Sequence, residues 1–194
     1  MEKLLIYELN EFPMRLLNEY ILLKPNSTLA YISKQGLLKQ TITSDSGELH
    51  PWSTWPTFYR GVDNSQHGLK FINQNKSFAD QNYPSVWDIL SIKNISIGIF
   101  GSLQSYPPPE INENIKFYLP DTFSADEKSF PKELEVFQKF NLSVVSNNNA
   151  IARNITLLQI KNFLECLSNR CISYSTLIKI IYQIIREKFS KKYK

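Results

Sequence analysis

The stretch SVWDILSIKNISIGIFG, residues 85–101, places a helix directly before a strand. Residues 85–92 have the pattern of a helix, with Ser85 at the position of its amino-terminal cap. Residues 95–100 are apolar, rich in β-branched side chains and followed by Gly101, which predicts a strand. A helix followed at once by a strand is the repeating unit of an α/β fold.

Other segments extend this pattern in both directions along the chain. A nearly continuous apolar run predicts a strand over residues 4–9, and further strands are predicted over residues 37–43, after the turn residue Gly36, and over residues 115–119. Helices are predicted between Pro13 and Pro25 and over residues 132–140, 156–167 and 176–189. Strands that alternate with helices predict an α/β fold with a largely parallel sheet flanked by helices.

Composition and charge exclude several classes of protein. The 194 residues are 42% hydrophobic with a mean hydropathy of -0.28, which excludes a disordered chain. No apolar run approaches the roughly 18 residues of a membrane span. Cys166 and Cys171 are too few for a disulfide scaffold or a zinc site. The start of the chain lacks the apolar core of a secretory signal, because Glu8 interrupts it, so we expect a cytoplasmic location.

The net charge of +4 lies at one end of the sequence. Residues 186–194 carry five positive charges and one negative, which leaves residues 1–185 neutral. A nucleic-acid-binding face needs basic residues spread over a surface, so we expect no nucleic-acid partner. The preceding segment, residues 177–185, is rich in isoleucine and predicts a broad apolar helix face. Such a face either packs on a core or partner, which we favour, or lies on an anionic membrane.

The segment HPWSTWPTFYRG, residues 50–61, is the most informative for chemistry. Pro56 suits the first turn of a helix that Gly61 ends, which places the Thr54 hydroxyl just before the predicted helix. Free backbone N–H groups and the helix dipole at that point attract an anion and stabilise negative charge on oxygen. Thr54 is therefore a candidate nucleophile if a divalent cation lowers its pKa. The alternative is that Ser53 or Thr54 only caps the helix.

This segment resembles the nucleophile region of the alkaline phosphatase superfamily, and is closest to the type I phosphodiesterase/nucleotide pyrophosphatase and sulfatase-like branch. Members of that branch have Thr or Ser, an aromatic residue, Pro, a short helix to Gly, and then His-Gly-Ile or His-Gly-Leu. Here that order is met by Thr54, Trp55, Pro56, Gly61 and His67-Gly68-Leu69. Residues 84–90 also look like the family's Trp-Asp-Leu-Leu helix, and residues 97–101 like the strand after it. The resemblance covers residues 3–125.

The resemblance implies a metal-dependent phosphoester or sulfate-ester hydrolase. Thr54 takes the position of the nucleophile and metal contact, with Ser53 as a substitute. The family's first metal-binding Asp has no Asp counterpart here. Alignment to the following helix favours Asn10 for that position, and strand length favours Glu8. The implied metal is zinc or manganese, and Arg60 is a candidate for binding the anionic substrate.

The resemblance also implies that part of the family's site is missing. Its late Asp-His-Gly metal motif does not occur in a chain whose only histidines are His50 and His67, and the family's His-Gly histidine shapes a loop rather than binding metal. We therefore expect residues 1–155 to form an incomplete phosphatase/sulfatase-like domain, and residues 156–194 a helical segment like the start of a family insertion. The alternative to a truncated hydrolase is a non-catalytic fragment or subunit that binds a partner through its C-terminal helices.

Overall fold

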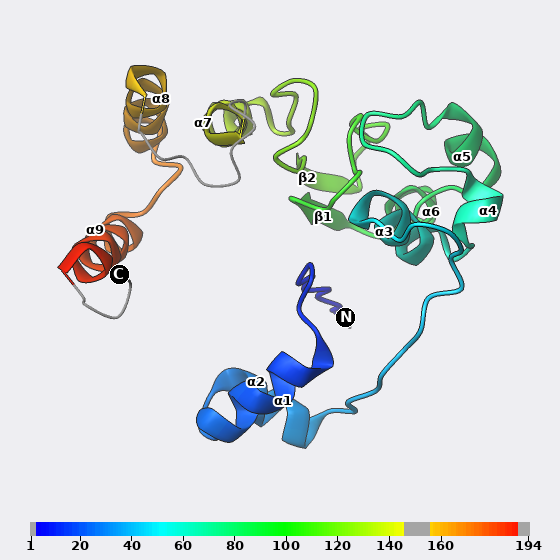
Figure 1. Cartoon of the computed structure of the whole chain (residues 1–194). Coiled ribbons are helices and arrows are strands. Elements are labelled where there is room, and N and C mark those ends of the chain that lie inside the picture. The colour runs from blue at the N-terminus through cyan, green and yellow to red at the C-terminus, as the bar shows by residue number, and fades with distance from the viewer. Residues whose placement is uncertain (1–2, 146–155, 190–194) are drawn as a thin grey trace.

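The computed structural model describes residues 3–145 and 156–189 (Figure 1). The two strands of this part are β1 (Ile97–Phe100) and β2 (Ile115–Leu119). The helices are α1 (Met14–Leu23), α2 (Thr28–Gln35), α3 (Pro51–Arg60), α4 (Asn64–His67), α5 (Ser77–Asn82), α6 (Val86–Ile92), the short 3-10 helix η1 (Lys132–Leu134), α7 (Glu135–Val145), α8 (Leu157–Ser168) and α9 (Tyr174–Phe189).

The helix–strand unit predicted around residues 85–101 is confirmed. Ser85 is the N-cap of α6, and its side chain forms a capping box with Asp88. Strand β1 follows α6 and pairs in parallel with β2, which occupies the residues predicted for it. The chain is therefore mixed α/β, as predicted.

The core lies where the sheet meets two helices. Tyr59 of α3 and Trp87 of α6 pack with Ile99 of β1 and with Ile115 and Tyr118 of β2. The rings of Tyr59 and Trp87 lie 4.7 Å apart between centroids. Aromatic pairs at this distance add to the stabilisation from burial. This cluster fixes α3, the helix with the candidate nucleophile, against the sheet.

The large parallel sheet that the sequence predicted is not formed within the described residues. Residues 4–9 and 37–43 were expected as strands, and neither is one. Both segments are extended but largely exposed, with Leu5 86% and Ile42 92% exposed. Since a strand is defined by backbone hydrogen bonds to a neighbour, an apolar run without that neighbour stays irregular. The observed sheet consists of β1 and β2 alone in the described part of the chain.

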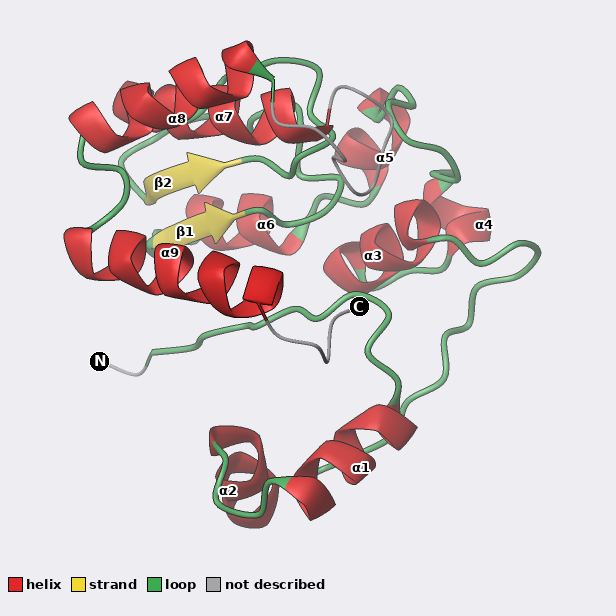
Figure 2. Cartoon of the chain, turned by 60° about the vertical axis from the view of Figure 1, so that its left-hand side comes forward, coloured by secondary structure: helices red, strands yellow, loops and turns green. Residues whose placement is uncertain are grey.

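The two ends of the chain differ in how they pack. Helices α1 and α2 are set apart from the sheet in both views (Figures 1 and 2), and α1 buries none of its side chains. Helix α8, by contrast, packs on α7, where Phe140 and Phe163 lie 5.6 Å apart and Gln159 Nε2 donates to Ser143 O at 3.0 Å. Helix α9 buries none of its described side chains. Among the described residues, no helix is long and apolar enough to cross a membrane.

Candidate functional site

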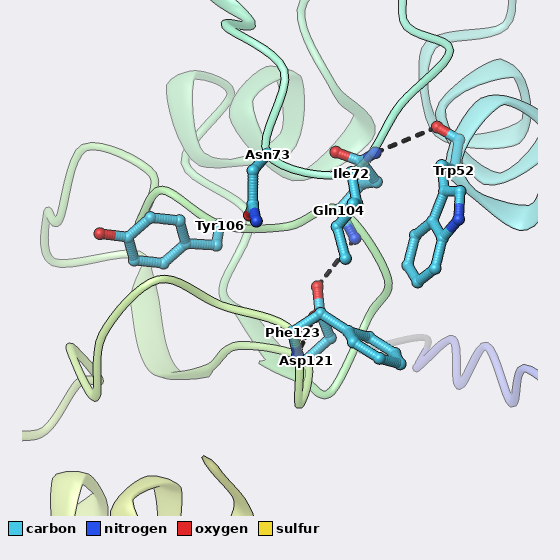
Figure 3. Close-up of a pocket in the computed structure, with 7 residues that line it drawn as sticks. All are labelled: Trp52, Ile72, Asn73, Gln104, Tyr106, Asp121 and Phe123. Atoms are coloured by element: carbon cyan, nitrogen blue, oxygen red, sulfur yellow. Dashed lines mark hydrogen bonds between the residues drawn. The ribbon is translucent and has the colours of Figure 1, made fainter. Parts of the chain in front are cut away.

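Helix α3 carries the candidate nucleophile, and it begins earlier than the sequence indicated. The prediction that Pro56 opens the helix is wrong, because α3 starts at Pro51 with His50 as its N-cap. Pro56 lies inside the helix, where it supplies no N–H to the carbonyl oxygen of Trp52. The side-chain amide of Gln104 donates to that oxygen at 3.2 Å and replaces the missing helical bond. Figure 3 shows this contact.

Thr54 consequently lies inside the first turn of the helix rather than before it. Its backbone N–H donates to His50 O at 3.0 Å, and its hydroxyl donates to the same oxygen at 3.1 Å. Ser53 is buried and makes the same pair of bonds to His50 O. Neither side chain caps α3, and the amide of Thr54 is not free to hold an anion.

Glu8 and Asn10 both reach α3 from the N-terminal segment. The Tyr59 hydroxyl donates to Glu8 Oε2 at 2.6 Å, and the Ser102 hydroxyl lies 3.5 Å from Glu8 Oε1. Since Ser102 follows β1 closely, the Glu8 carboxylate lies near the carboxyl end of that strand. Burial raises the pKa of the Tyr59 hydroxyl far above its usual value, and the Glu8 carboxylate raises it further. Trp55 Nε1 donates to Asn10 Oδ1 at 3.0 Å.

Arg60 is committed to contacts within the chain. Its guanidinium side chain is 4% exposed and donates to Asp80 Oδ1 at 2.6 Å and to Tyr83 O at 2.5 Å. A buried guanidinium that donates to a carboxylate and to a carbonyl holds two segments together. In this arrangement Arg60 ties α3 to α5 and to the residue that follows α5.

A second polar cluster on α3 was not found from the sequence. The Thr57 hydroxyl donates to Asp45 Oδ1 at 2.6 Å and lies 3.0 Å from Nε2 of the buried His67. Leu69 N–H donates to His67 Nδ1 at 3.0 Å, so the neutral ring carries its proton on Nε2 and donates to Thr57. Burial lowers the pKa of His67, although the Asp45 carboxylate opposes that shift. The proton of Thr57 therefore points to Asp45, and His67 is not its base.

The His67-Gly68 pair was the only signal in the sequence for this cluster. We expected His67 to shape the loop after α3, and its contacts with Thr57 and Leu69 join that loop to the helix. Asp45 lies 12 residues before Thr57 in the sequence, and no sequence motif around it indicates this contact. One of its carboxylate oxygens, Oδ2, is buried without a hydrogen-bond partner among the described residues.

Beside Gln104 lies a small pocket, shown in Figure 3. Asp121 Oδ2 accepts from Gln104 N at 2.9 Å, and Lys76 Nζ donates to Gln104 O at 2.7 Å. Burial lowers the pKa of Lys76 to about 8 and raises that of Asp121. The pocket offers about 20 Å³, enough for a single water molecule. Ligand pockets are at least ten times larger, at roughly 300–1,000 Å³, so this one holds no substrate.

These contacts bear on whether a divalent metal fits. The oxygens of Glu8 and Asn10 accept hydrogen bonds from Tyr59, Ser102 and Trp55, and the Thr54 hydroxyl is bonded to His50. Among the described residues, no three His, Cys, Asp or Glu side chains gather as a metal-binding group. The residues present therefore do not fit a zinc or manganese ion in this arrangement. What the site does provide is a helix surface to which the N-terminal segment is tied by Glu8 and Asn10.

The chain was compared with known proteins by sequence and by structure. No protein-family model, curated protein or solved structure matches the chain.

Proposed function

We propose that this chain acts by binding another protein through its N-terminal region, residues 3–43. The observation that carries the proposal is the apolar surface that this region exposes, in a chain whose total exposed surface is large. The chain exposes 14918 Å². A compact monomer of 22.6 kDa is expected to expose only about 9,500 Å². A protein normally buries such additional surface, either within its own fold or against a bound partner.

Much of the N-terminal region consists of large apolar side chains in contact with water. They come from the segment before α1, from α1 and α2, and from the segment after α2: Leu4, Leu5, Tyr7, Leu22, Leu23, Tyr31, Ile32, Leu37, Leu38 and Ile42. Soluble monomers rarely expose apolar residues in such numbers over one region, and large exposed patches mark interaction sites. Residues 4–9 also have the sequence pattern of a buried strand.

The backbone of this region indicates that the partner is a polypeptide. Residues 4–9 and 37–43 are extended, and no backbone-to-backbone hydrogen bond joins them to another described segment. Extended backbone of this kind pairs readily with a strand of another protein, which supplies N–H and C=O partners together with apolar side chains. Such a partner satisfies both features of the region at once.

Hydrogen–deuterium exchange on the purified full-length chain tests this proposal. In dilute solution we expect the amides of residues 4–9 and 37–43 to exchange without protection, while those of α3, β1 and β2 are protected. An apolar dye such as anilinonaphthalene sulfonate should bind, and Ile42→Asp should reduce that binding more than Thr41→Asp, the matched control with the same added charge. Strong protection of both segments in the dilute monomer would refute the proposal, because the region would then be covered by its own chain.

The metal-dependent ester hydrolase is the second proposal. The described residues do not gather as a metal-binding group, which counts against it, and one observation favours it. Glu8 and Asn10, the candidate metal ligands, contact the same helix that carries Thr54. The assay is turnover of nitrophenyl phosphate, a phosphodiester and a sulfate ester with added zinc or manganese. We expect negligible turnover of the purified chain, because its candidate ligands are bonded to other side chains. Turnover that disappears in Thr54→Ala would instead support the hydrolase.

A further inference from the structure

Helix α9 presents a broad apolar face that no other described part of the chain covers. Its exposed apolar side chains recur at helical spacing: Tyr174, Ile178, Ile181, Tyr182, Ile184, Ile185 and Phe189. Ile178 is 67% exposed and Phe189 77% exposed. A soluble helix normally buries its apolar stripe, since that packing supplies most of its stability. Something other than water is therefore expected against this face.

The positive charge on and after α9 indicates which kind of partner covers the apolar face. Lys179 and Arg186 are seven residues apart and share the side of α9 next to the apolar face. The sequence from residue 186 to the last residue carries five positive charges and one negative, which equals the net charge of the whole chain. The one strongly charged region of the sequence thus begins within α9. This charge favours an anionic partner.

We propose that α9 binds the surface of an anionic lipid bilayer. At 16 residues it is too short to cross a membrane, but it suits a helix that lies in the interface. Its isoleucines enter the boundary between headgroups and acyl chains, while Lys179 and Arg186 contact lipid phosphates. Tyr174 and Tyr182 carry a hydroxyl on an apolar ring, the kind of side chain that is enriched at this depth.

Two other anionic partners suit the helix less well. A nucleic acid is held by cations on the contacting face itself, whereas the cations of α9 flank an apolar face. An acidic protein meets the charge but has to present a matching apolar groove, while a bilayer offers both features without a special shape. The surface on α9 is also distinct from the N-terminal region, so this inference does not depend on the partner proposed there.

Vesicle sedimentation with the full-length chain tests the inference. We expect the chain to bind vesicles of phosphatidylcholine mixed with phosphatidylglycerol at least about tenfold more tightly than vesicles of phosphatidylcholine alone. Added salt should weaken the binding. Ile181→Glu, in the middle of the apolar face, should abolish it.

Gln183→Glu is the matched control, because it adds the same charge on the opposite side of α9. It also loses the bond from Gln183 Nε2 to Glu187 Oε1, which makes the comparison stringent. We expect this variant to keep most of its binding, and circular dichroism should show equal helix content in both variants. Equal or absent binding to the two vesicle types overturns the inference. So does sedimentation-velocity evidence that the chain self-associates through α9 and that Ile181→Glu only restores the monomer.

Discussion

The Gln104 side chain donates to the carbonyl oxygen of α3 that Pro56 leaves without a helical partner. Gln104 donates through its amide to the carbonyl oxygens of Trp52 and Phe71, at 3.2 and 3.1 Å, and its backbone contacts Asp121 and Lys76. Its backbone φ of 63° lies in the left-handed region, which is uncommon for a residue other than glycine. Gln104 therefore joins the start of α3 to the loop after β1.

Removing the Gln104 amide should destabilise the chain in a way that depends on Pro56. In Gln104→Met the Trp52 and Phe71 carbonyls lose their donor, so we expect a loss of about 1–3 kcal/mol in the free energy of unfolding. Pro56→Ala restores a helical N–H to Trp52. In the Pro56→Ala background, Gln104→Met should therefore lower the free energy of unfolding by measurably less. Urea denaturation of the four variants measures this difference. Equal costs in the two backgrounds would mean that Gln104 does not substitute for the helical bond.

His67 should make stability depend on acidic pH. The His67 side chain is 1% exposed, and burial lowers its pKa below the value of 6.5 that applies when the chain is unfolded. Above that value both states are neutral and His67 adds no pH dependence. As the pH falls from 6.5 toward the lower pKa of the folded state, only the unfolded state takes up the proton, so stability decreases.

Urea denaturation at a series of pH values measures this effect. We expect His67→Asn to lower stability near neutral pH and to flatten the loss below 6.5. His50→Asn, at the exposed histidine, is the matched control for the substitution itself. If His67→Asn shows the same slope as the parent chain, another group is responsible.

At the scale of elements, the pairing of β1 with β2 depends on a glycine, Gly98, which has no side chain. Gly98 is paired in register with Phe117, and a Cβ added at Gly98 would lie 2.1 Å from Cε1 of the Phe117 ring. The ring therefore occupies the space above the glycine. This close approach explains why a residue with low strand propensity lies in the middle of β1.

Gly98→Ala should destabilise the chain although alanine is the better residue in a regular strand. The Phe117 ring has to move, and we expect a loss of about 1–3 kcal/mol. In a Phe117→Ala background the added methyl group meets no ring, so the same substitution should be close to neutral. Chemical denaturation of the four variants gives the coupling energy. A penalty that persists without the Phe117 ring would point to the backbone instead.

At the scale of the whole molecule, the main feature is how little surface folding removes. The core of Tyr59, Trp87, Ile99, Ile115 and Tyr118 is compact, but the N-terminal region and α9 lie outside it. Each carries apolar side chains that the described chain does not cover. Both proposals place partners on these surfaces, a polypeptide on the first and a lipid bilayer on the second.

The large exposed surface should be visible in the urea dependence of unfolding. The slope of the free energy of unfolding against urea scales with the surface exposed on unfolding. From the 14918 Å² that the folded chain already exposes, we expect a slope about three-quarters of that for a compact chain of this length. A slope typical of a compact protein would show that residues 3–43 and α9 are buried in solution.

The sequence by itself determined most of the helices and the central helix–strand unit. The predicted helix over residues 132–140 corresponds to η1 and α7, and those over residues 156–167 and 176–189 correspond to α8 and α9 within a few residues. Helices form by hydrogen bonds between residues close in sequence, so caps and apolar spacing suffice to locate them. The strands predicted at β1 and β2 are confirmed, because each of these two segments has the other as its hydrogen-bonded neighbour.

Tertiary structure alone decided the rest. Residues 4–9 have the same kind of apolar run as β1 but no backbone hydrogen bonds to a neighbouring strand among the described residues, and local sequence does not reveal whether such a strand exists. The donor to the Trp52 carbonyl is Gln104, 52 residues further along the chain, and the contacts of Thr57 with Asp45 and His67 depend on the loops around α3. Thr54 was placed before a helix on the evidence of Pro56, whereas the helix starts at Pro51 and contains Pro56. Contacts between residues far apart in sequence are set by packing, which no local pattern encodes.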